Sequence, residues 1–280
     1  MTALDRISFE FFPPKSAEAE TKLAKVRDRL DAARPEFYSV TYGAGGSTRD
    51  RTLETVLAIR EEGRNVAPHL SMGSDDNGTV RALLDRYRNA GVDRIVALRG
   101  DVPSGMGGSG SVHFARELVE LLRHHAGDDF TIEVACYPEV HPDARSPESD
   151  LAHFQDKVKA GADEAITQFF YNADAYFDFV DRATAAGVRV PIIPGVMPIT
   201  NVEGLLRFAD GCGAEIPRWI RLRLEQYRDD RESLHAFGLD VVTDLCRRLL
   251  DGGAPGFHFY TMNQSKASLE LLRRLGHGLD

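Results

Sequence analysis

ISFEFFPPKS, the stretch from Ile7 to Ser16, predicts a buried strand that carries a carboxylate in its middle. Phe9 and Phe11 flank Glu10, and an ionised carboxylate among apolar side chains is costly unless it is paired or used. Two prolines follow directly, and they end the strand because proline has no N–H to give to a sheet. The acidic residue near the end of this strand therefore needs a structural or chemical reason.

Seven further strand-like runs follow, and amphipathic helical runs separate them. The predicted strands cover residues 6–12, 36–42, 66–71, 93–99, 130–137, 164–170, 190–196 and 256–261. Val80, Leu83, Leu84 and Tyr87 illustrate the helical stripe, with apolar residues one turn apart. Strands and helices that alternate about every 30 residues are typical of parallel βαβ units. Eight such units predict a (β/α)8 TIM barrel, formed by a single domain over residues 1–280.

Two stretches of the chain are longer than the repeat requires. Residues 201–253 exceed the length of one helix and predict an additional helix before the last strand. A Gly- and Ser-rich stretch at residues 100–111 predicts a long loop after the fourth strand. We find no linker rich in Pro, Gly or Ser that would divide the chain into two domains, and we expect the stretch at residues 100–111 to be a flexible loop.

Composition and charge exclude several classes of protein. The 280 residues are 42% hydrophobic and 28% charged, which is typical of a globular protein. The formal net charge is −9 and basic residues do not cluster, so we expect no binding to nucleic acid or to membranes. We find no long apolar run, no signal peptide and no cysteine pattern of a disulfide or metal site. A cytoplasmic protein without a metal is therefore expected.

Polar residues gather on one face of the predicted strands. Because side chains alternate along a strand, Glu10 lies opposite Phe9 and Phe11. The same alternation predicts an inward-facing polar set of Glu10, Thr41, His69, Glu133, Tyr137, Gln168, His258 and Tyr260. Polar residues at the C-terminal ends of barrel strands are typical of the catalytic face of a barrel enzyme. For any single residue of this set, the alternative is a structural role, as a buried polar group whose hydrogen bonds are satisfied.

Turns rich in glycine or containing histidine follow several strands. Each turn could be a simple connection between a strand and a helix, or a loop that binds a ligand. These turns are VTYGAGGSTRDRT (Val40–Thr52), LRGD (Leu98–Asp101) and YPEVHP (Tyr137–Pro142). The next helix carries Asp150, His153 and Lys157 on one face. The spacing of these residues allows two interpretations, a face exposed to solvent and a face that binds a ligand. The glycines match neither a Rossmann nor a Walker loop, and a G-x-S-x-G nucleophile motif is absent.

Taken together and in order, these motifs closely resemble the bacterial methylenetetrahydrofolate reductase family. The resemblance runs from about Ile7 to Leu275 through FEFFPPKS, VTYGAGGSTRDRT, APHL, ALRGD, YPEVHP, AITQFF, IIPGVMPITN and FHFYTMN. It implies a (β/α)8 barrel that binds FAD at its top face. It also implies a ping-pong hydride relay, in which NADH or NADPH reduces FAD, and the reduced flavin then reduces 5,10-methylenetetrahydrofolate to 5-methyltetrahydrofolate. The family feeds methionine synthesis and is typically homo-oligomeric.

The resemblance also implies roles for individual residues. Glu10 matches the general acid that helps open the methylene bridge, and Asp101 matches an acid that contacts the pterin and influences the flavin. The positions that match FAD contacts are Thr41, Tyr42, Ala44, His69, Arg99, Gly100, Asp101, Ala115, Tyr137, His141, Ala144, Asp150, His153 and Lys157. Substrate contacts match Glu10, Thr41, Asp101, Gln168, Phe208, Tyr260 and Gln264, of which Phe208 is an aromatic that moves over the site.

Three positions depart from the family pattern. His153 stands where relatives carry Asn, whereas Gly204 and Gln264 replace Gln and Arg near the folate or the nucleotide. These departures concern the folate tail and the nucleotide, and they leave Glu10 unchanged.

Two other functions stay open at this point. One is another flavin barrel, such as a proline-dehydrogenase-like oxidase, whose substrate would be an amino acid. The other is a non-catalytic folate-binding or scaffold protein, whose preparation would be colourless. The sequence also leaves open whether the reductant is NADH or NADPH, and whether the protein forms a dimer or a tetramer.

Overall fold

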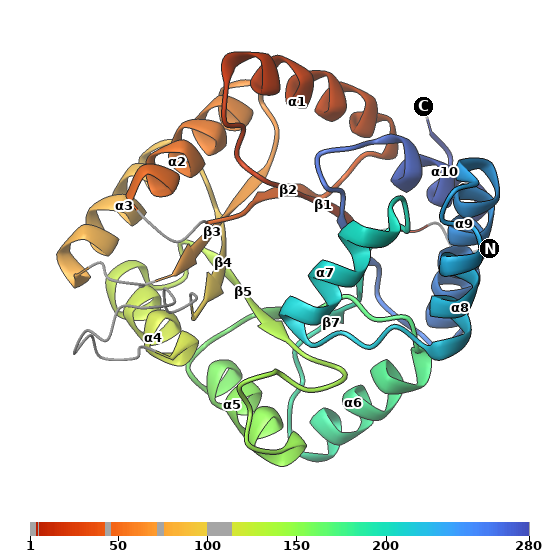
Figure 1. Cartoon of the computed structure of the whole chain (residues 1–280). Coiled ribbons are helices and arrows are strands. Elements are labelled where there is room, and N and C mark those ends of the chain that lie inside the picture. The colour runs from red at the N-terminus through yellow and green to blue at the C-terminus, as the bar shows by residue number, and fades with distance from the viewer. Residues whose placement is uncertain (1–3, 5, 43–45, 72–75, 100–113, 280) are drawn as a thin grey trace.

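A ring of helices surrounds a barrel of parallel strands in the computed structural model, which describes residues 4, 6–42, 46–71, 76–99 and 114–279 (Figure 1). The strands are β1 (Ile7–Phe11), β2 (Phe37–Val40), β3 (Val66–Ser71), β4 (Arg94–Leu98), β5 (Thr131–Cys136), β6 (Glu164–Thr167), β7 (Ile192–Ile193), β8 (Gly195–Val196) and β9 (Phe257–Tyr260). Their order in the sheet is β7-β6-β5-β4-β3-β2-β1-β9-β8. Because β7 and β8 are consecutive in the chain, the sheet closes on itself, and the predicted (β/α)8 barrel is confirmed.

The helices lie between these strands in the chain and cover the barrel from outside. They are α1 (Ala17–Leu30), a 3₁₀ turn (Asp31–Ala33), α2 (Gly46–Glu61), α3 (Asn77–Asn89), α4 (Ala115–Ala126), α5 (Pro147–Lys159), α6 (Ala173–Ala185), α7 (Val202–Cys212), α8 (Arg218–Gln226), α9 (Arg231–Asp251) and α10 (Lys266–Arg274). Several begin at a side chain that accepts a hydrogen bond from the first turn, namely Ser16, Asp76, Ser146, Asn172, Asn201 and Asp230. Within the described ranges, none has both the length and the apolar character needed to cross a bilayer.

Two local features differ from the sequence prediction in detail. The strand predicted at residues 190–196 is two short strands, β7 and β8, on either side of Pro194. A proline interrupts a strand because it lacks the N–H that the ladder needs. The additional helix predicted within residues 201–253 is present, and the segment in fact holds three helices, α7, α8 and α9.

Apolar side chains fill two separate regions of the barrel. The larger cluster lies between the outer faces of the strands and the helices, and it includes Phe9, Phe11, Leu70 and Phe257. The smaller cluster lies inside the barrel and takes one side chain from each of five strands, Phe37, Ala67, Val96, Ile166 and Ile193. This inner layer separates a polar region at the N-terminal ends of the strands from another at their C-terminal ends.

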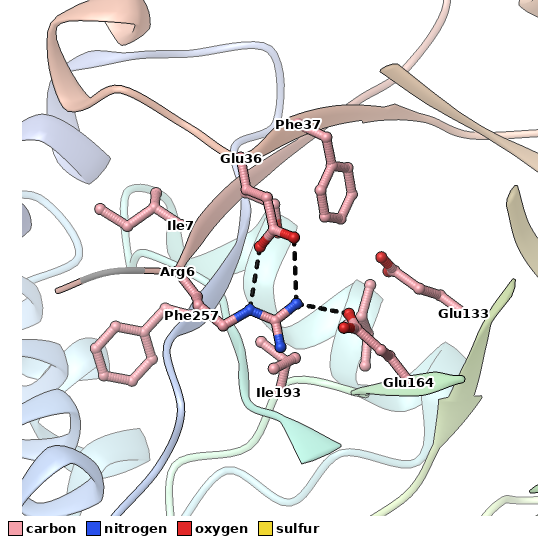
Figure 2. Close-up of a pocket in the computed structure, with 10 residues that line it drawn as sticks. Arg6, Ile7, Glu36, Phe37, Glu133, Glu164, Ile193 and Phe257 are labelled. Carbon is pink, nitrogen blue, oxygen red and sulfur yellow. Dashed lines mark hydrogen bonds and ion pairs between the residues drawn. The ribbon is translucent and has the colours of Figure 1, made fainter. Parts of the chain in front are cut away.

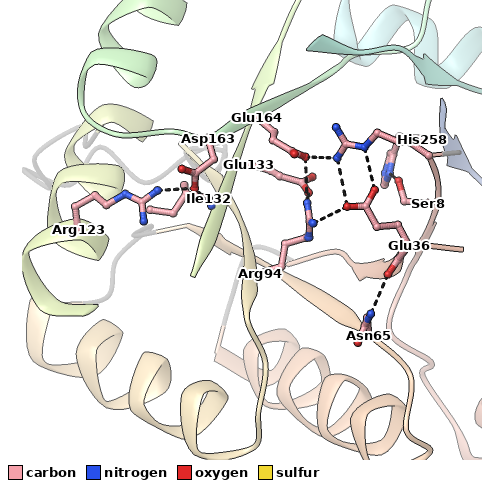
Figure 3. Close-up of polar contacts among 11 residues, drawn as sticks. Ser8, Glu36, Asn65, Arg94, Arg123, Ile132, Glu133, Asp163, Glu164 and His258 are labelled. Carbon is pink, nitrogen blue, oxygen red and sulfur yellow. Dashed lines mark hydrogen bonds and ion pairs between the residues drawn. The ribbon is translucent and has the colours of Figure 1, made fainter. Parts of the chain in front are cut away.

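Five charged residues form what we call the floor cluster, at the N-terminal end of the barrel (Figures 2 and 3). Arg6 pairs with Glu36 at 3.1 Å and with Glu164 at 2.6 Å. Arg94 pairs with Glu36 at 2.7 Å, Glu133 at 2.5 Å and Glu164 at 3.1 Å. Three carboxylates thus share two guanidinium groups inside the sheet.

The position of Glu133 corrects one sequence prediction. The alternation of polar residues assigned it to the top of the barrel, but it lies low, paired with Arg94 in the floor cluster. Alternation fixes the face of a strand on which a side chain lies, but it does not fix the height of that side chain along the barrel. Glu133 is the third residue of β5 and pairs in register with Glu164, the first residue of β6, which places it at the floor.

Candidate active site

Glu10 lies near the C-terminal end of β1 with its side chain inside the barrel, where it is 13% exposed. In register it pairs with Ser39 of β2 and with Tyr260 of β9. Glu10 Oε2 lies 3.3 Å from Nε2 of His69 and 3.6 Å from Nε2 of His258. The carboxylate in the first strand is therefore matched by two imidazole rings, from β3 and β9.

The two histidines differ in how they are held. Burial lowers the pKa of His69, which Glu10 opposes, so this ring tends to be neutral near pH 7. His258 is 1% exposed, and its Nδ1 lies 2.7 Å from Oγ of Ser8. A carboxyl next to imidazole rings can hold or exchange a proton, which is the role of a general acid or base.

Tyr260 forms a fixed wall beside Glu10. Its hydroxyl donates a hydrogen bond to the carbonyl of Thr167, at 2.8 Å. Burial, and then Glu10, raise the pKa of the Tyr260 phenol well above its ordinary value, so the phenol stays neutral. Gly195 leaves the space for this ring, because a Cβ at residue 195 would lie 2.6 Å from its Cε2 atom.

The loop between β5 and α5 brings several predicted FAD contacts together. The rings of Tyr137 and His141 meet edge to face, with their centroids 4.6 Å apart. Asp150 accepts a hydrogen bond from the backbone N–H of His141, at 2.9 Å. The backbone N–H of Asp143 donates to Nδ1 of His141 at 3.0 Å, and the Asp143 carboxylate pairs with Arg99 at the end of β4. Burial, and then Arg99, lower the pKa of His141.

Two positive groups face this loop from neighbouring elements. Arg99 follows β4, and the Lys157 ammonium on α5 donates a hydrogen bond to the carbonyl of Ala135 on β5. Burial lowers the pKa of Lys157, and Cys136 and Asp150 offset this lowering only in part. This side of the barrel therefore supplies cationic groups within a chain whose net charge is −9.

The remaining predicted FAD contacts on this side lie at the beginnings of α4 and α5. Ala115 is the first residue of α4, and the ring of Phe114 before it stacks on His153 of α5, with centroids 5.4 Å apart. Ala144 lies in the loop before α5, and its N–H donates to the carbonyl of His141 at 2.9 Å. His153 is thus half of an aromatic pair.

Thr41 and Tyr42 directly follow β2, on the strand beside Glu10. The N–H of Thr41 donates to the carbonyl of Phe11 at 2.9 Å, and its carbonyl accepts from the hydroxyl of Thr52 at 2.9 Å. These contacts place the Thr41 backbone beside the C-terminal end of β1.

Three further predicted substrate contacts, Phe208, Gln168 and Gln264, come from α7 and from the segments after β6 and β9. Helix α7 crosses inside the ring of outer helices (Figure 1), and its Phe208 stacks on Phe12 with centroids 6.4 Å apart. Gln168 follows β6, and its Oε1 accepts a hydrogen bond from the N–H of Phe169 at 3.0 Å. Gln264 is exposed in the turn after β9.

The structure thus joins two groups of predicted residues. Glu10, His69 and Tyr260 meet inside the mouth, whereas Arg99, Tyr137, His141, Asp150 and Lys157 meet around the loop after β5. Ala44, Gly100 and Asp101 lie outside the described residues, so their predicted roles remain predictions.

Two residues that hold parts of this region in place were not in the predicted site. Ser8 holds His258, and Asn263 bridges the N–H and the carbonyl of Phe12 at 2.8 and 3.0 Å. Asn263 has a φ of 57°, and Met262 before it has a φ of 52°, so this turn uses left-handed backbone at two residues that are not glycine. Ser8 could have been found, because it shares a strand face with Glu10 and the first and last strands of a closed barrel are neighbours.

The fold and this mouth define a class of protein, the (β/α)8 barrels with a polar site at the C-terminal ends of their strands. The family model described as methylenetetrahydrofolate reductase matches residues 3–276, and the chain belongs to the methylenetetrahydrofolate reductase family.

Known relatives agree with this assignment. The chain is 42% identical over 271 residues to the 5,10-methylenetetrahydrofolate reductase of Salmonella typhimurium and 41% identical to that of Escherichia coli. Each alignment covers 96% of this chain and 90% of the relative. Methylenetetrahydrofolate reductase (NADH) 1 of Arabidopsis thaliana is 38% identical, and the alignment spans 48% of that longer protein.

A solved structure has the same fold. It is an uncharacterized protein from Clostridium thermocellum that binds two copies of 5-methyl-5,6,7,8-tetrahydrofolic acid. Its TM-score is 0.67 over 98% of this chain and 96% of the other, at 17% sequence identity. At this identity the likeness concerns the fold alone.

Proposed function

We propose that this protein reduces 5,10-methylenetetrahydrofolate to 5-methyltetrahydrofolate with NADH or NADPH, in a ping-pong reaction that depends on FAD. One observation carries the proposal: Glu10 lies at the mouth between His69 and His258, in a chain that matches the family model over residues 3–276. A carboxyl in this place suits a reaction that consumes one proton for each molecule of folate reduced.

The proposed FAD site is the side of the mouth formed by β4, β5 and α5. Its residues suit a flavin dinucleotide, because Arg99 and Lys157 are cations that a diphosphate needs, and the edge-to-face rings of Tyr137 and His141 offer an aromatic wall. Asp150 fixes the loop by accepting from the backbone of His141. When bound, FAD would supply the transfer of hydride between the nicotinamide and the folate.

In this proposal Glu10 is the proton donor. The methylene bridge of the substrate opens when one of its two amine nitrogens takes a proton and leaves as a neutral amine. The other nitrogen then forms an iminium with the methylene carbon, and this carbon accepts the hydride. Glu10 gives the proton, and it regains one from solvent before the next turnover.

The remaining residues would bind and orient the substrates. We assign folate or nucleotide contacts to Thr41, Asp101, Gln168, Phe208, Tyr260 and Gln264, and FAD contacts also to Tyr42, Ala44, His69, Gly100, Ala115, Ala144 and His153. The contact between Phe208 and Phe12 supports a role for α7 in covering bound substrate. A cytoplasmic homo-oligomer that feeds methionine synthesis completes the proposal, and this part rests on the family resemblance.

The absorption spectrum and two anaerobic half-reactions test the proposal. We expect a yellow protein whose flavin bands bleach with NADH or NADPH and return when 5,10-methylenetetrahydrofolate is added, with 5-methyltetrahydrofolate as product. A colourless protein that cannot be reconstituted with FAD would contradict it. Bleaching by proline, without reoxidation by the folate, would instead support the amino-acid oxidase.

A further inference from the structure

Two contacts fix the orientation of the His258 ring. Ser8 and His258 pair in register on β1 and β9, and Ser8 Oγ lies 2.7 Å from Nδ1 of the ring (Figure 3). The ring of Phe37 stacks against His258, with centroids 6.2 Å apart. With one face packed and Nδ1 bound, the other nitrogen, Nε2, is held toward Glu10.

The Nε2 atom of His258 is a buried polar atom without a hydrogen-bond partner among the described residues. Buried polar atoms are normally satisfied, so such an atom calls for an explanation. Glu10 Oε2, at 3.6 Å, lies just beyond hydrogen-bond range. Hydrogen bonds of catalytic groups often tighten when substrate binds, and a small rotation of the Glu10 carboxyl would close this gap.

The tautomer of His258 decides what this contact does. If Nδ1–H donates to Ser8 Oγ, Nε2 keeps a lone pair that accepts the proton of a protonated Glu10 and repels the ionised carboxylate. If Nδ1 instead accepts from the Ser8 hydroxyl, Nε2–H donates to the carboxylate and favours its ionised form. The first tautomer suits the proposed role of Glu10 as a proton donor, because it favours the protonated carboxyl.

Other titratable groups face the Glu10 carboxyl or the His258 ring. His69 from β3 lies 3.3 Å from Glu10, and burial lowers its pKa. Tyr260 from β9 faces Glu10, and burial raises its pKa, so it stays neutral. Glu133 from β5 faces His258 from the floor, where Arg94 pairs with it. Ser8 fixes the ring of His258 and Arg94 fixes Glu133 at the floor, whereas the hydroxyl of Tyr260 donates to the backbone carbonyl of Thr167.

We propose that His258, with Nδ1–H donating to Ser8, is a positioning residue that keeps the Glu10 carboxyl protonated in the working enzyme. This proposal rests on the proposed function, since it assigns Glu10 the role of proton donor. His258 need not touch the substrate. It acts by making the ionised form of Glu10 unfavourable until the proton leaves for the folate.

Two substitutions of His258 separate its two nitrogens. In His258→Asn the short amide can still reach Ser8, but it cannot reach Glu10. In His258→Gln the longer amide can place an oxygen close to the position of Nε2, where it can accept from Glu10. Ser8→Ala keeps the ring and removes the group that fixes its tautomer. Glu133→Gln is the matched control, because it changes the charge near His258 without touching Glu10.

The measurement is the pH profile of each half-reaction of the FAD-loaded enzyme. We expect His258→Asn to move the alkaline limb of folate reduction about one pH unit lower, a roughly tenfold loss on that limb. Flavin reduction by NADH should stay within about twofold of wild type. His258→Gln should recover most of the shift, Ser8→Ala should show part of it, and Glu133→Gln should show none.

Infrared difference spectroscopy of the same proteins gives a readout besides activity. The band of the protonated Glu10 carboxyl, identified by its loss in Glu10→Gln, should disappear at lower pH in His258→Asn than in wild type. An unchanged limb and band in both His258→Asn and Ser8→Ala would overturn the proposal, as would a shift to higher pH. If wild type fails to reduce the folate, the proposed function fails, whereas the infrared band still tests the role of His258.

Discussion

Glu10→Gln replaces a proton donor by an amide of nearly the same size, between His69 and His258. The amide preserves the packing but cannot give the proton that opening of the methylene bridge requires. We therefore expect folate reduction to fall by about a hundredfold or more, whereas flavin reduction by NADH persists. Stopped-flow absorbance of each half-reaction measures both effects.

The same substitution at Glu133 serves as the control for this experiment. Glu133 lies inside the barrel too, but at the floor, so Glu133→Gln should leave folate reduction near the wild-type rate. An equal loss of both half-reactions in Glu10→Gln would show instead that Glu10 is a structural residue.

Single residues also show how far alternation along a strand can predict a site. It placed Glu10 and His258 on the inner face, and the structure confirms both. It placed Glu133 at the wrong height, because the shear of the barrel sets height and one strand does not reveal shear. The sequence did not predict the left-handed turn at Met262 and Asn263, because neither residue type requires a positive φ.

Among the elements, β8 depends on Gly195. A Cβ at this residue would lie 2.2 Å from the carbonyl oxygen of Thr167 and 2.6 Å from the Tyr260 ring. Backbone cannot move aside cheaply, so Gly195→Ala should lower the free energy of unfolding by about 2 kcal/mol or more. Urea denaturation measures the loss.

Gly211, in α7, offers a matched control for this substitution. A Cβ there meets nothing within 4 Å, and alanine favours a helix over glycine. Gly211→Ala should therefore leave the protein as stable as wild type or stabilise it by up to about 1 kcal/mol. A loss at residue 195 no larger than the change at residue 211 would refute the close-approach argument.

The elements themselves were the most predictable part of the fold. Apolar runs and helical stripes identified every strand region, because period two and period 3.6 differ strongly over a whole element. The division of residues 190–196 at Pro194 follows from the chemistry of proline, although the run of apolar residues concealed it. The segment 201–253 holds three helices, one more than the two expected there, since the length of a segment does not reveal how it divides.

For the whole molecule, the floor cluster makes stability depend on pH. Burial raises the pKa of Glu133 to about 7, against the effect of Arg94. In the unfolded chain this carboxyl titrates near its ordinary value of 4.5. Between these values the folded protein binds more protons than the unfolded one, so the stabilisation is full below about pH 4.5 and is lost as the pH rises through about 7.

Glu133→Gln tests this dependence because an amide does not titrate. The free energy of unfolding of wild type, relative to the variant, should fall by about 3 kcal/mol between about pH 4.5 and pH 8. Urea denaturation at several pH values measures the difference. If the free energy of unfolding changed with pH in the same way in both proteins, Glu133 would have the same pKa in the folded and the unfolded chain.

The floor cluster also bears on how such a chain can change over generations. Its five members come from β1, β2, β4, β5 and β6 or from the residue just before them, and two cations serve three anions. Reversing one charge would set like charges against each other where water is scarce, so a lone replacement should be selected against. Viable replacements should then arrive in compensating sets, and these five positions should drift together among descendants while the mouth stays constant.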